Sequence, residues 1–336
     1  MSLFGVRRHI GPAPLSDEGH LPGFDAATGW LNSPPLTAEG LRGKVVLVEF
    51  WTYTCINWLR TLGYVRAWAE KYGDRGLVVV GVHTPEFPFE RDVDNVSQAA
   101  KDLRVEYPIA LDSDYGVWRA FSNRYWPAVY IADAEGRIRF HQFGEGMYEE
   151  SERVIQQLLR DAGHEGIGDE LVSIAPDGFE AQADWTNLAS PETYLGYEQG
   201  QNLASEDGLE LDKPHTYVTP DSLRLNQWAL GGEWTIERGA SVLNRPDGRI
   251  SFRFRARDVH LVLGPRERRT TVPFRVHVDG EPPGDAHGLD VDEQGLGTVA
   301  QQRLSQLIRE RGSIVDRTIE ITFLAPGVEA SVFTFG

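Results

Sequence analysis

The sequence predicts an α/β domain of moderate size followed by an antiparallel β-sandwich, and three observations lead to this prediction. In the first half, apolar runs typical of buried parallel strands alternate with segments whose apolar residues recur at helical spacing. In the second half, short segments alternate apolar and polar residues between Gly, Pro and Asp, as antiparallel strands with one buried face do. The length of 336 residues suits two domains of ordinary size.

The first half gives the element order β-α-β-α-β-β-α. The Pro- and Gly-rich chain up to about residue 36 is expected to be irregular. Strands are predicted at residues 45–50, 77–82, 107–111, 128–132 and 137–143. Helices are predicted at residues 56–72, 93–103 and 149–162. Parallel strands come first, and a hairpin with a turn at residues 134–136 comes last, which is typical of an α/β sandwich.

The periodicity changes in the second half. Residues 164–190 contain no strong element. Strands are predicted at residues 249–257, 260–264, 274–280, 318–324 and 330–336. We therefore place the α/β domain at residues 1–165, a linker at residues 166–190 and the β-sandwich at residues 191–336.

The composition argues against several classes of partner. The net charge of −17 argues against nucleic acid, because phosphate binding needs a basic surface. No apolar run reaches the ~18 residues of a membrane helix, so no membrane segment is expected. The first residues contain arginines but no apolar core of a secretory signal, which favours the cytoplasm. A leader removed upstream would instead allow an extracytoplasmic location.

The chain has one cysteine, which rules out an intramolecular disulfide. Cys55 follows a predicted buried strand and precedes a predicted helix. Free amide groups and the helix dipole at a helix N-terminus stabilise an anion, so a thiol there should lose its proton more easily and become nucleophilic. The alternative is that Cys55 is a small buried hydrophobic residue.

Two segments carry a resemblance to a known family. Residues 48–58, VEFWTYTCINW, match a strand, a Phe-Trp pair and a Cys-x-x-Cys loop in which Trp58 replaces the second cysteine. Residues 123–133, NRYWPAVYIAD, place Pro127 before an apolar strand. With GVHTPEF at residues 81–87, these motifs resemble the thioredoxin-like superfamily, and within it redoxin (AhpC/TSA-like) proteins and the C-terminal part of DipZ-type proteins. The resemblance implies a thioredoxin fold and an oxidoreductase role in cell redox homeostasis.

The resemblance also implies roles for individual residues. Cys55 matches the reactive cysteine, and Pro127 matches a cis-proline that faces the thiol. Glu49 falls where thioredoxins keep a buried carboxylate, which should have a raised pKa and shuttle protons; the alternative is a carboxylate bonded to a neighbouring side chain. Trp58 removes the resolving thiol, so the protein cannot cycle through its own disulfide. Gly63 is a second departure, because relatives often have a helix-kinking proline there.

The first functional hypothesis is a thiol-based oxidoreductase, or antioxidant, that acts through one cysteine. Cys55 would attack a peroxide or a disulfide of a client protein, and an external thiol reductant would resolve the product. Thr52-x-x-Cys55 matches the threonine and cysteine of one-cysteine peroxiredoxins, and Arg124 is the candidate for their peroxide-orienting arginine. Val48 stands where those proteins have a proline, so a general thiol oxidoreductase is favoured over a peroxidase.

The second hypothesis is a non-catalytic module that binds a peptide or a small ligand. Aromatic side chains near the thiol would form a groove for an extended chain, unless they belong to the core. The residues predicted to bind substrate or ligand are Trp51, Trp58, Trp126 and Pro127.

The third hypothesis places a function in the second half. Residues 190–197, 225–234 and 253–264 resemble a carbohydrate-binding-module-type jelly roll of DipZ-type proteins. Sugar sites need exposed aromatic side chains, for which Trp228 and Trp234 are candidates, although tryptophans in such strands are more often core. Carbohydrate therefore stays an unproven partner.

No cofactor is expected. The histidines at positions 260, 277 and 287 show no tight ligand spacing, so we predict no metal site. Phosphate-binding loops, hydrolase signatures and dinucleotide fingerprints are not convincing in the sequence.

Overall fold

The computed structural model describes residues 15–205 and 208–336, which fall into two compact units. The first unit takes in the chain up to Trp51, Tyr64–Thr84 and Leu103–Ile174. The second unit takes in Thr52–Gly63, Pro85–Asp102 and Ala175–Gly336. The loop that carries Cys55 therefore belongs to the same unit as the C-terminal strands.

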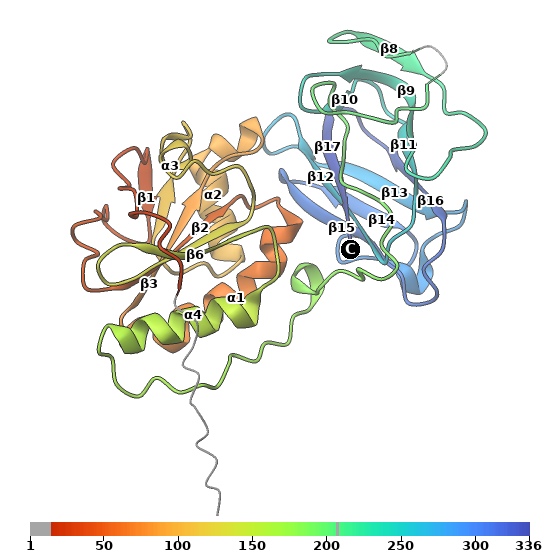
Figure 1. The fold of residues 1–336 in the computed structure, drawn as a ribbon. Coiled ribbons are helices and arrows are strands. Elements are labelled where there is room, and N and C mark those ends of the chain that lie inside the picture. Colours follow the sequence, from red (N-terminus) through yellow and green to blue (C-terminus); the bar gives the residue numbers. More distant parts are fainter. Residues whose placement is uncertain (1–14, 206–207) are drawn as a thin grey trace, which may run out of the picture. The chain divides into compact units, whose positions relative to one another are not determined.

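The first unit is built on a six-stranded mixed sheet in the order β1-β4-β3-β2-β5-β6 (Figure 1). Its strands are β1 (Gly29–Leu31), β2 (Val45–Trp51), β3 (Leu77–His83), β4 (Ile109–Leu111), β5 (Ala128–Ala132) and β6 (Ile138–Phe143). β2, β3 and β4 are parallel, and the other three strands pair antiparallel to their neighbours. This is the α/β thioredoxin fold that the sequence predicts.

Four α-helices and four 3-10 helices complete the described chain. They are α1 (Ile56–Tyr72), α2 (Val93–Asp102), α3 (Gly116–Ala120), α4 (Tyr148–Asp161), η1 (Gly73–Arg75), η2 (Pro88–Arg91), η3 (Gly178–Glu180) and η4 (Gly284–Ala286). In the described residues, no helix is both long enough and apolar enough to cross a membrane.

Strand β2 is buried on both faces, as its apolar run predicts. Val46, Val48 and Phe50 point into one core, which they share with residues of the N-terminal segment such as Phe24. The opposite face carries Glu49 at its centre. The acid is therefore placed in an apolar interior by the strand that leads to Cys55.

The strands of the second unit form one antiparallel sheet in the order β14-β13-β16-β11-β9-β10-β17-β12-β15, with β7 on β17 and β8 on β9 (Figure 1). They are β7 (Thr193–Tyr194), β8 (Pro214–Tyr217), β9 (Trp228–Ile236), β10 (Ser241–Leu243), β11 (Gly248–Phe254), β12 (Asp258–Pro265), β13 (Val272–Val278), β14 (Leu296–Val299), β15 (Arg303–Arg309), β16 (Arg317–Phe323) and β17 (Val328–Phe335).

This sheet curls into the predicted β-sandwich. β9 and β10 separate β11 from β17 in the sheet, yet the rings of Phe252 on β11 and Phe333 on β17 lie 5.0 Å apart. The turn in the sheet occurs within β9, whose first residues pair with β11 and whose last residues pair with β8 and β10. Gly232, at φ +93°, lies where the pairing changes, in a backbone conformation that favours glycine.

Several elements differ from their prediction. β1 lies in the segment expected to be irregular, because it is a three-residue edge strand on β4 without an apolar run. The strand predicted at residues 107–111 begins only at Ile109, after Pro108. β9 was not predicted, since its Gly231-Gly232 pair is a turn signal. Helix α1, by contrast, has the predicted bounds, residues 56–72, and continues through Gly63.

Candidate active site around Cys55

Cys55 lies at the start of α1 and is partly exposed. Its backbone N–H donates to the carbonyl of Thr52 at 3.2 Å, which closes a turn between β2 and α1. Its carbonyl accepts the N–H of Leu59 at 3.0 Å, the first bond of the helix. The turn therefore holds the thiol at the N-terminus of α1, where the sequence predicts it.

The electrostatics of the thiol differ from the expectation. Burial raises the pKa of Cys55, and the carboxylates of Glu86 and Glu192 raise it further. The backbone N–H groups of Trp58 and Asn57 act in the opposite direction, as expected for a helix N-terminus, but are outweighed. The thiol is therefore harder to deprotonate than a free cysteine.

A buried carboxylate, Glu90, fixes the cysteine loop. Its Oε1 accepts the hydroxyl of Thr54 at 2.6 Å, and its Oε2 accepts the backbone N–H groups of Glu86 at 2.6 Å and Phe87 at 2.9 Å. Burial raises the pKa of Glu90, while the hydroxyls of Thr52 and Thr54 lower it. Thr52 is thus buried and acts on Glu90. Glu90 ties the residues next to Cys55 to the segment that enters η2.

A second group of polar side chains surrounds Glu86. The hydroxyl of Tyr194 donates to Oε1 of Glu86 at 2.5 Å and lies 3.3 Å from Oε2 of Glu192. Burial and the neighbouring Glu90 and Glu192 raise the pKa of Glu86 to about 8, against a smaller lowering by Tyr194. Both carboxylates that oppose ionisation of Cys55 thus share one tyrosine.

Glu49 is fully buried and accepts a hydrogen bond from the hydroxyl of Tyr107. Burial and the adjacent Glu49 raise the pKa of Tyr107 well above its usual value. Gly81, opposite Glu49 on β3, makes room for this arrangement. A Cβ atom there would lie 2.8 Å from Nε1 of Trp51 and 3.1 Å from the Tyr107 ring. Glu49 therefore has the bonded neighbour considered above as an alternative to proton transfer.

The Trp126–Pro127 peptide bond is cis, as the resemblance implies. It lies just before β5, where Ala128 pairs with Phe50 at the end of β2. Nε1 of Trp126 donates to the carbonyl of Thr84 at 3.1 Å, and the N–H of Thr84 donates to the carbonyl of Trp51 at 3.0 Å. Within the first unit, the predicted binding residues Trp51, Trp126 and Pro127 therefore lie at one end of the inner strands of the sheet.

The remaining predicted residues have varied surroundings. Trp51 and Trp58 are fully buried, and Trp126 is partly exposed. Arg124 is exposed on the loop before the cis bond. The histidine next to Trp51, His83, is also buried, with its ring 4.8 Å from that of Trp51, and burial lowers its pKa to about 3, so it is neutral. Thr52, Cys55 and Trp58 lie close together along the chain, in the turn between β2 and α1 and the first turn of α1.

The tryptophans considered for sugar binding lie in the core of the second unit. Trp228 and Trp234 are buried there, and their Nε1 atoms donate to the carbonyls of Gln201 and Gly231 at 2.7 and 2.9 Å. They present no aromatic surface on which a sugar could stack, so both are corrected to core residues.

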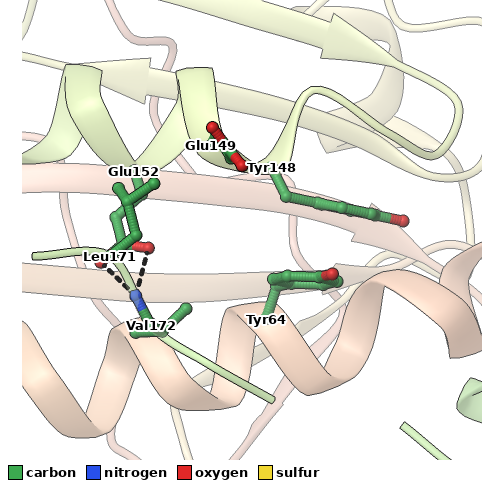
Figure 2. Close-up of a pocket in the computed structure, with 6 residues that line it drawn as sticks. All are labelled: Tyr64, Tyr148, Glu149, Glu152, Leu171 and Val172. Carbon is green, nitrogen blue, oxygen red and sulfur yellow. Dashed lines mark hydrogen bonds between the residues drawn. The ribbon is translucent and has the colours of Figure 1, made fainter. Parts of the chain in front are cut away.

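The first unit also contains a cavity of about 290 Å³ between α1 and α4 (Figure 2). It is lined by Tyr64, Tyr148, Glu149, Glu152, Leu171 and Val172. Figure 2 shows the stacked rings of Tyr64 and Tyr148, with centroids 3.8 Å apart, and the bonds from the Val172 N–H to Glu152. None of the predicted site residues lines this cavity.

The acidic neighbours of the thiol are not among the residues predicted from the sequence. Glu86 lies in the quoted segment GVHTPEF, where an acid stands between Pro85 and Phe87 in an apolar stretch. That placement is the only local signal for it. Glu192 and Tyr194 lie in the segment that begins the predicted β-sandwich, and no local pattern indicates that they meet Glu86.

Two family models match separate parts of the chain. The Redoxin family model matches residues 27–159, and the model described as thioredoxin like C-terminal domain matches residues 190–336. Among solved structures, a thioredoxin-like protein in its oxidised form is 31% identical with a TM-score of 0.38, over 44% of this chain and 97% of that one.

Two relatives show how the similarity is distributed. Protein DipZ of Mycobacterium tuberculosis and of Mycobacterium bovis is 37% identical over 281 residues, 81% of this chain. This match spans only 39% of DipZ. Thiol-disulfide oxidoreductase YkuV of Bacillus subtilis is 31% identical over 142 residues, which cover 42% of this chain and 95% of YkuV.

Proposed function

This chain belongs to the thioredoxin-like redoxin family, and from that premise we propose that it is a thiol oxidoreductase that acts through Cys55 alone. The relatives DipZ and YkuV support the class of reaction, since YkuV is a thiol-disulfide oxidoreductase by name. The single-cysteine mechanism is the part that is new to this chain, whose only cysteine is Cys55.

One observation carries the proposal. Cys55 is partly exposed at the N-terminus of α1, with the N–H groups of Asn57 and Trp58 acting on its sulfur. These N–H groups favour the thiolate, which is the reactive form. Trp58, in the place of a second cysteine, is fully buried. A reaction at Cys55 must therefore be completed by a thiol from outside the chain.

The proposed reaction is thiol–disulfide exchange in two steps. In the first, the Cys55 sulfur attacks one sulfur of a client disulfide, an S–S bond forms to Cys55, and the other client sulfur leaves as a thiolate. In the second, an external thiolate attacks this mixed disulfide and releases Cys55 as a thiolate, which regains a proton. The client disulfide is reduced, and the external thiol is oxidised.

Three residues keep proposed roles in this reaction. Glu49 is the proposed proton shuttle, and Pro127 the proposed turn that faces the substrate. Trp126, which is partly exposed beside the cis bond, is the proposed contact for the client chain.

A second candidate is a binding module that keeps the fold without the chemistry. The observation that favours it is the raised pKa of the Cys55 thiol, caused by burial and by Glu86 and Glu192. A thiol that stays protonated near neutral pH is a weak nucleophile. Under this alternative, binding of a peptide ligand should not change when Cys55 is alkylated.

The test is trapping of the mixed disulfide. Reduced protein is mixed with glutathione disulfide at several pH values, and adducts are counted by intact mass, with Cys55→Ser as the control. We expect one adduct on folded wild-type protein, formed faster as pH rises, none on Cys55→Ser, and complete release by dithiothreitol. An adduct that forms only after denaturation would refute the proposal and favour the binding module.

A further inference from the structure

The carboxylates beside Cys55 come from two distant parts of the second unit. Glu86 precedes η2, and Glu192 precedes β7. Both act electrostatically on the Cys55 thiol. Neither has a part in the exchange reaction as written above.

Hydrogen bonds fix Glu86 relative to the cysteine loop. Thr54, the neighbour of Cys55, donates its hydroxyl to Oε1 of Glu90 at 2.6 Å. Oε2 of the same carboxylate accepts the backbone N–H of Glu86 at 2.6 Å. Because Glu90 is buried, water competes little with these bonds, and they hold the two segments together.

Tyr194 in turn fixes the side chain of Glu86. Its hydroxyl has one proton to donate and lies closer to Glu86, at 2.5 Å, than to Glu192, at 3.3 Å. Burial raises the pKa of Tyr194, and the nearby carboxylates raise it further, so the hydroxyl remains a donor. Tyr194 is itself anchored on β7, where it pairs with Val332 of β17.

We propose that Glu86, positioned by Tyr194, exchanges a proton with the Cys55 thiol during thiol–disulfide exchange. The inference rests on the proposed function and adds to it the group that handles the proton. It also gives Tyr194, a residue of the C-terminal β-structure, a positioning role in the chemistry of the thiol.

The ionised Glu86 carboxylate takes the proton of the Cys55 thiol as the sulfur attacks the client disulfide. The Cys55–client S–S bond forms, the client S–S bond breaks, and the leaving client sulfur departs as a thiolate. Protonated Glu86 then gives its proton to that thiolate, so the carboxylate is restored and the client leaves as a thiol.

Glu86 suits this role better than an ordinary surface acid. A general base works best when its pKa lies near the operating pH. Burial, with Glu90 and Glu192, raises the pKa of Glu86 to about 8. An unperturbed glutamate, at about 4.3, would be too weak a base for a thiol that is itself hard to deprotonate.

The experiment measures how the rate of mixed-disulfide formation at Cys55 depends on pH. Rates with glutathione disulfide are followed by intact mass between about pH 6 and pH 11, so that the span reaches well above the ordinary thiol pKa of about 8.5, because the pKa of Cys55 is raised. Wild type is compared with Glu86→Gln, Glu49→Gln and Cys55→Ser. Glu198→Gln is the matched control, because Glu198 lies in the same unit but pairs with Arg238.

The expected wild-type profile has two rises, the first near pH 8 as Glu86 ionises and the second at alkaline pH as the thiol ionises. In Glu86→Gln the first rise should disappear, with a loss of about tenfold or more near pH 8, while the alkaline rise remains. Glu198→Gln should match wild type. Far-UV circular dichroism and the urea midpoint check that each variant is folded.

Two further variants test the positioning. Tyr194 lowers the pKa of Glu86, so Tyr194→Phe should move the first rise to higher pH. Glu192 raises that pKa, so Glu192→Gln should move the first rise to lower pH. Opposite shifts from two neighbouring residues are not expected from a general loss of structure.

Three results would overturn the inference. If Glu86 is only a repelling charge, Glu86→Gln reacts as fast as wild type or faster at every pH. If the first rise persists in Glu86→Gln but is lost in Glu49→Gln, the proton passes through Glu49 instead. If folded wild type forms no adduct at any pH, the proposed function fails and the inference fails with it; an adduct on wild type with either of the first two results defeats the inference alone.

Discussion

Nζ of Lys71 on α1 lies 2.9 Å from Oε1 of Glu152 on α4, and Glu152 is almost fully buried. The same carboxylate accepts the hydroxyl of Tyr72 at 2.7 Å and the N–H of Val172 at 2.9 Å. Burial alone would raise the pKa of Glu152, but these bonds outweigh it and hold the pKa below its usual value. Two helices and the chain that follows them thus meet at one ionised group.

The first prediction concerns stability in acid. Because the pKa of Glu152 is lower in the folded state than in the unfolded state, its contribution is present above the unfolded pKa and is lost as pH falls through the folded one. Glu152→Gln should lower the free energy of unfolding at neutral pH by about 1–3 kcal/mol and weaken the decline in acid. Urea denaturation at several pH values measures both. The exposed Glu150→Gln, on the same helix, is the control, and an unchanged acid limb in Glu152→Gln would contradict the prediction.

The second prediction concerns stability between weakly acidic and neutral pH, where Glu86 acts with the opposite sign to Glu152. The pKa of Glu86 is raised to about 8 by burial and by Glu90 and Glu192, so the folded state binds an extra proton between the unfolded pKa and about 8. Stability should therefore fall as pH rises through this window, by at most about 1.4 kcal/mol per pH unit from this group. Glu86→Gln should remove that part of the slope in urea denaturation. A slope equal to that of wild type would show that Glu86 titrates normally.

The third prediction concerns Gly81, which lies opposite Glu49 on β3. Gly81→Ala would bring a Cβ to 2.8 Å from Nε1 of Trp51 and 3.1 Å from the Tyr107 ring. Overpacking of this kind should cost about 1–3 kcal/mol in the free energy of unfolding. Gly73→Ala is the matched control, because a Cβ there meets nothing within 4 Å. Equal stability of the two variants would mean that the interior around Glu49 can expand.

How much of this protein can be predicted from its sequence depends on the range of the interactions. The runs that form β2, β3 and β5 are local and apolar, and residues 128–132 were predicted with the observed bounds. The position of Cys55 before α1 is local too. The local sequence, however, does not show which strands are neighbours in the sheet. The short edge strand β1, which is a strand because it pairs with β4, is therefore not predicted.

The electrostatics of the candidate site could not be predicted in the same way. A helix N-terminus lowers the pKa of a thiol, and this part of the prediction was sound. Burial outweighs it first of all, and Glu86 and Glu192 add to the effect of burial. All of these depend on folding of the chain over long separations, since Tyr194 meets Glu86 across 108 residues. No periodicity or motif reports such a contact. The sequence therefore indicates the candidate nucleophile but neither the burial nor the charges that raise its pKa.

The last prediction concerns Trp58, the residue in the place of a second cysteine. Trp58 is fully buried, so Trp58→Ala should lower the free energy of unfolding by about 3–5 kcal/mol through the cavity that it leaves. Trp58→Phe should lose less, because much of the ring volume is kept. Urea denaturation gives both values, with Trp185→Ala, 60% exposed in wild type, as the control.

The stability of the Trp58 variants shows whether the core favours tryptophan over a second cysteine at this position. If Trp58 contributes to the core as expected, replacing it by cysteine would remove buried volume while adding a thiol, and the dithiol form would be less stable than the present one. Return to a Cys-x-x-Cys loop would then need compensating changes in the surrounding core. If Trp58→Ala instead costs no more than Trp185→Ala, the indole is not part of the core, and the absence of a second cysteine has no structural cause at this position.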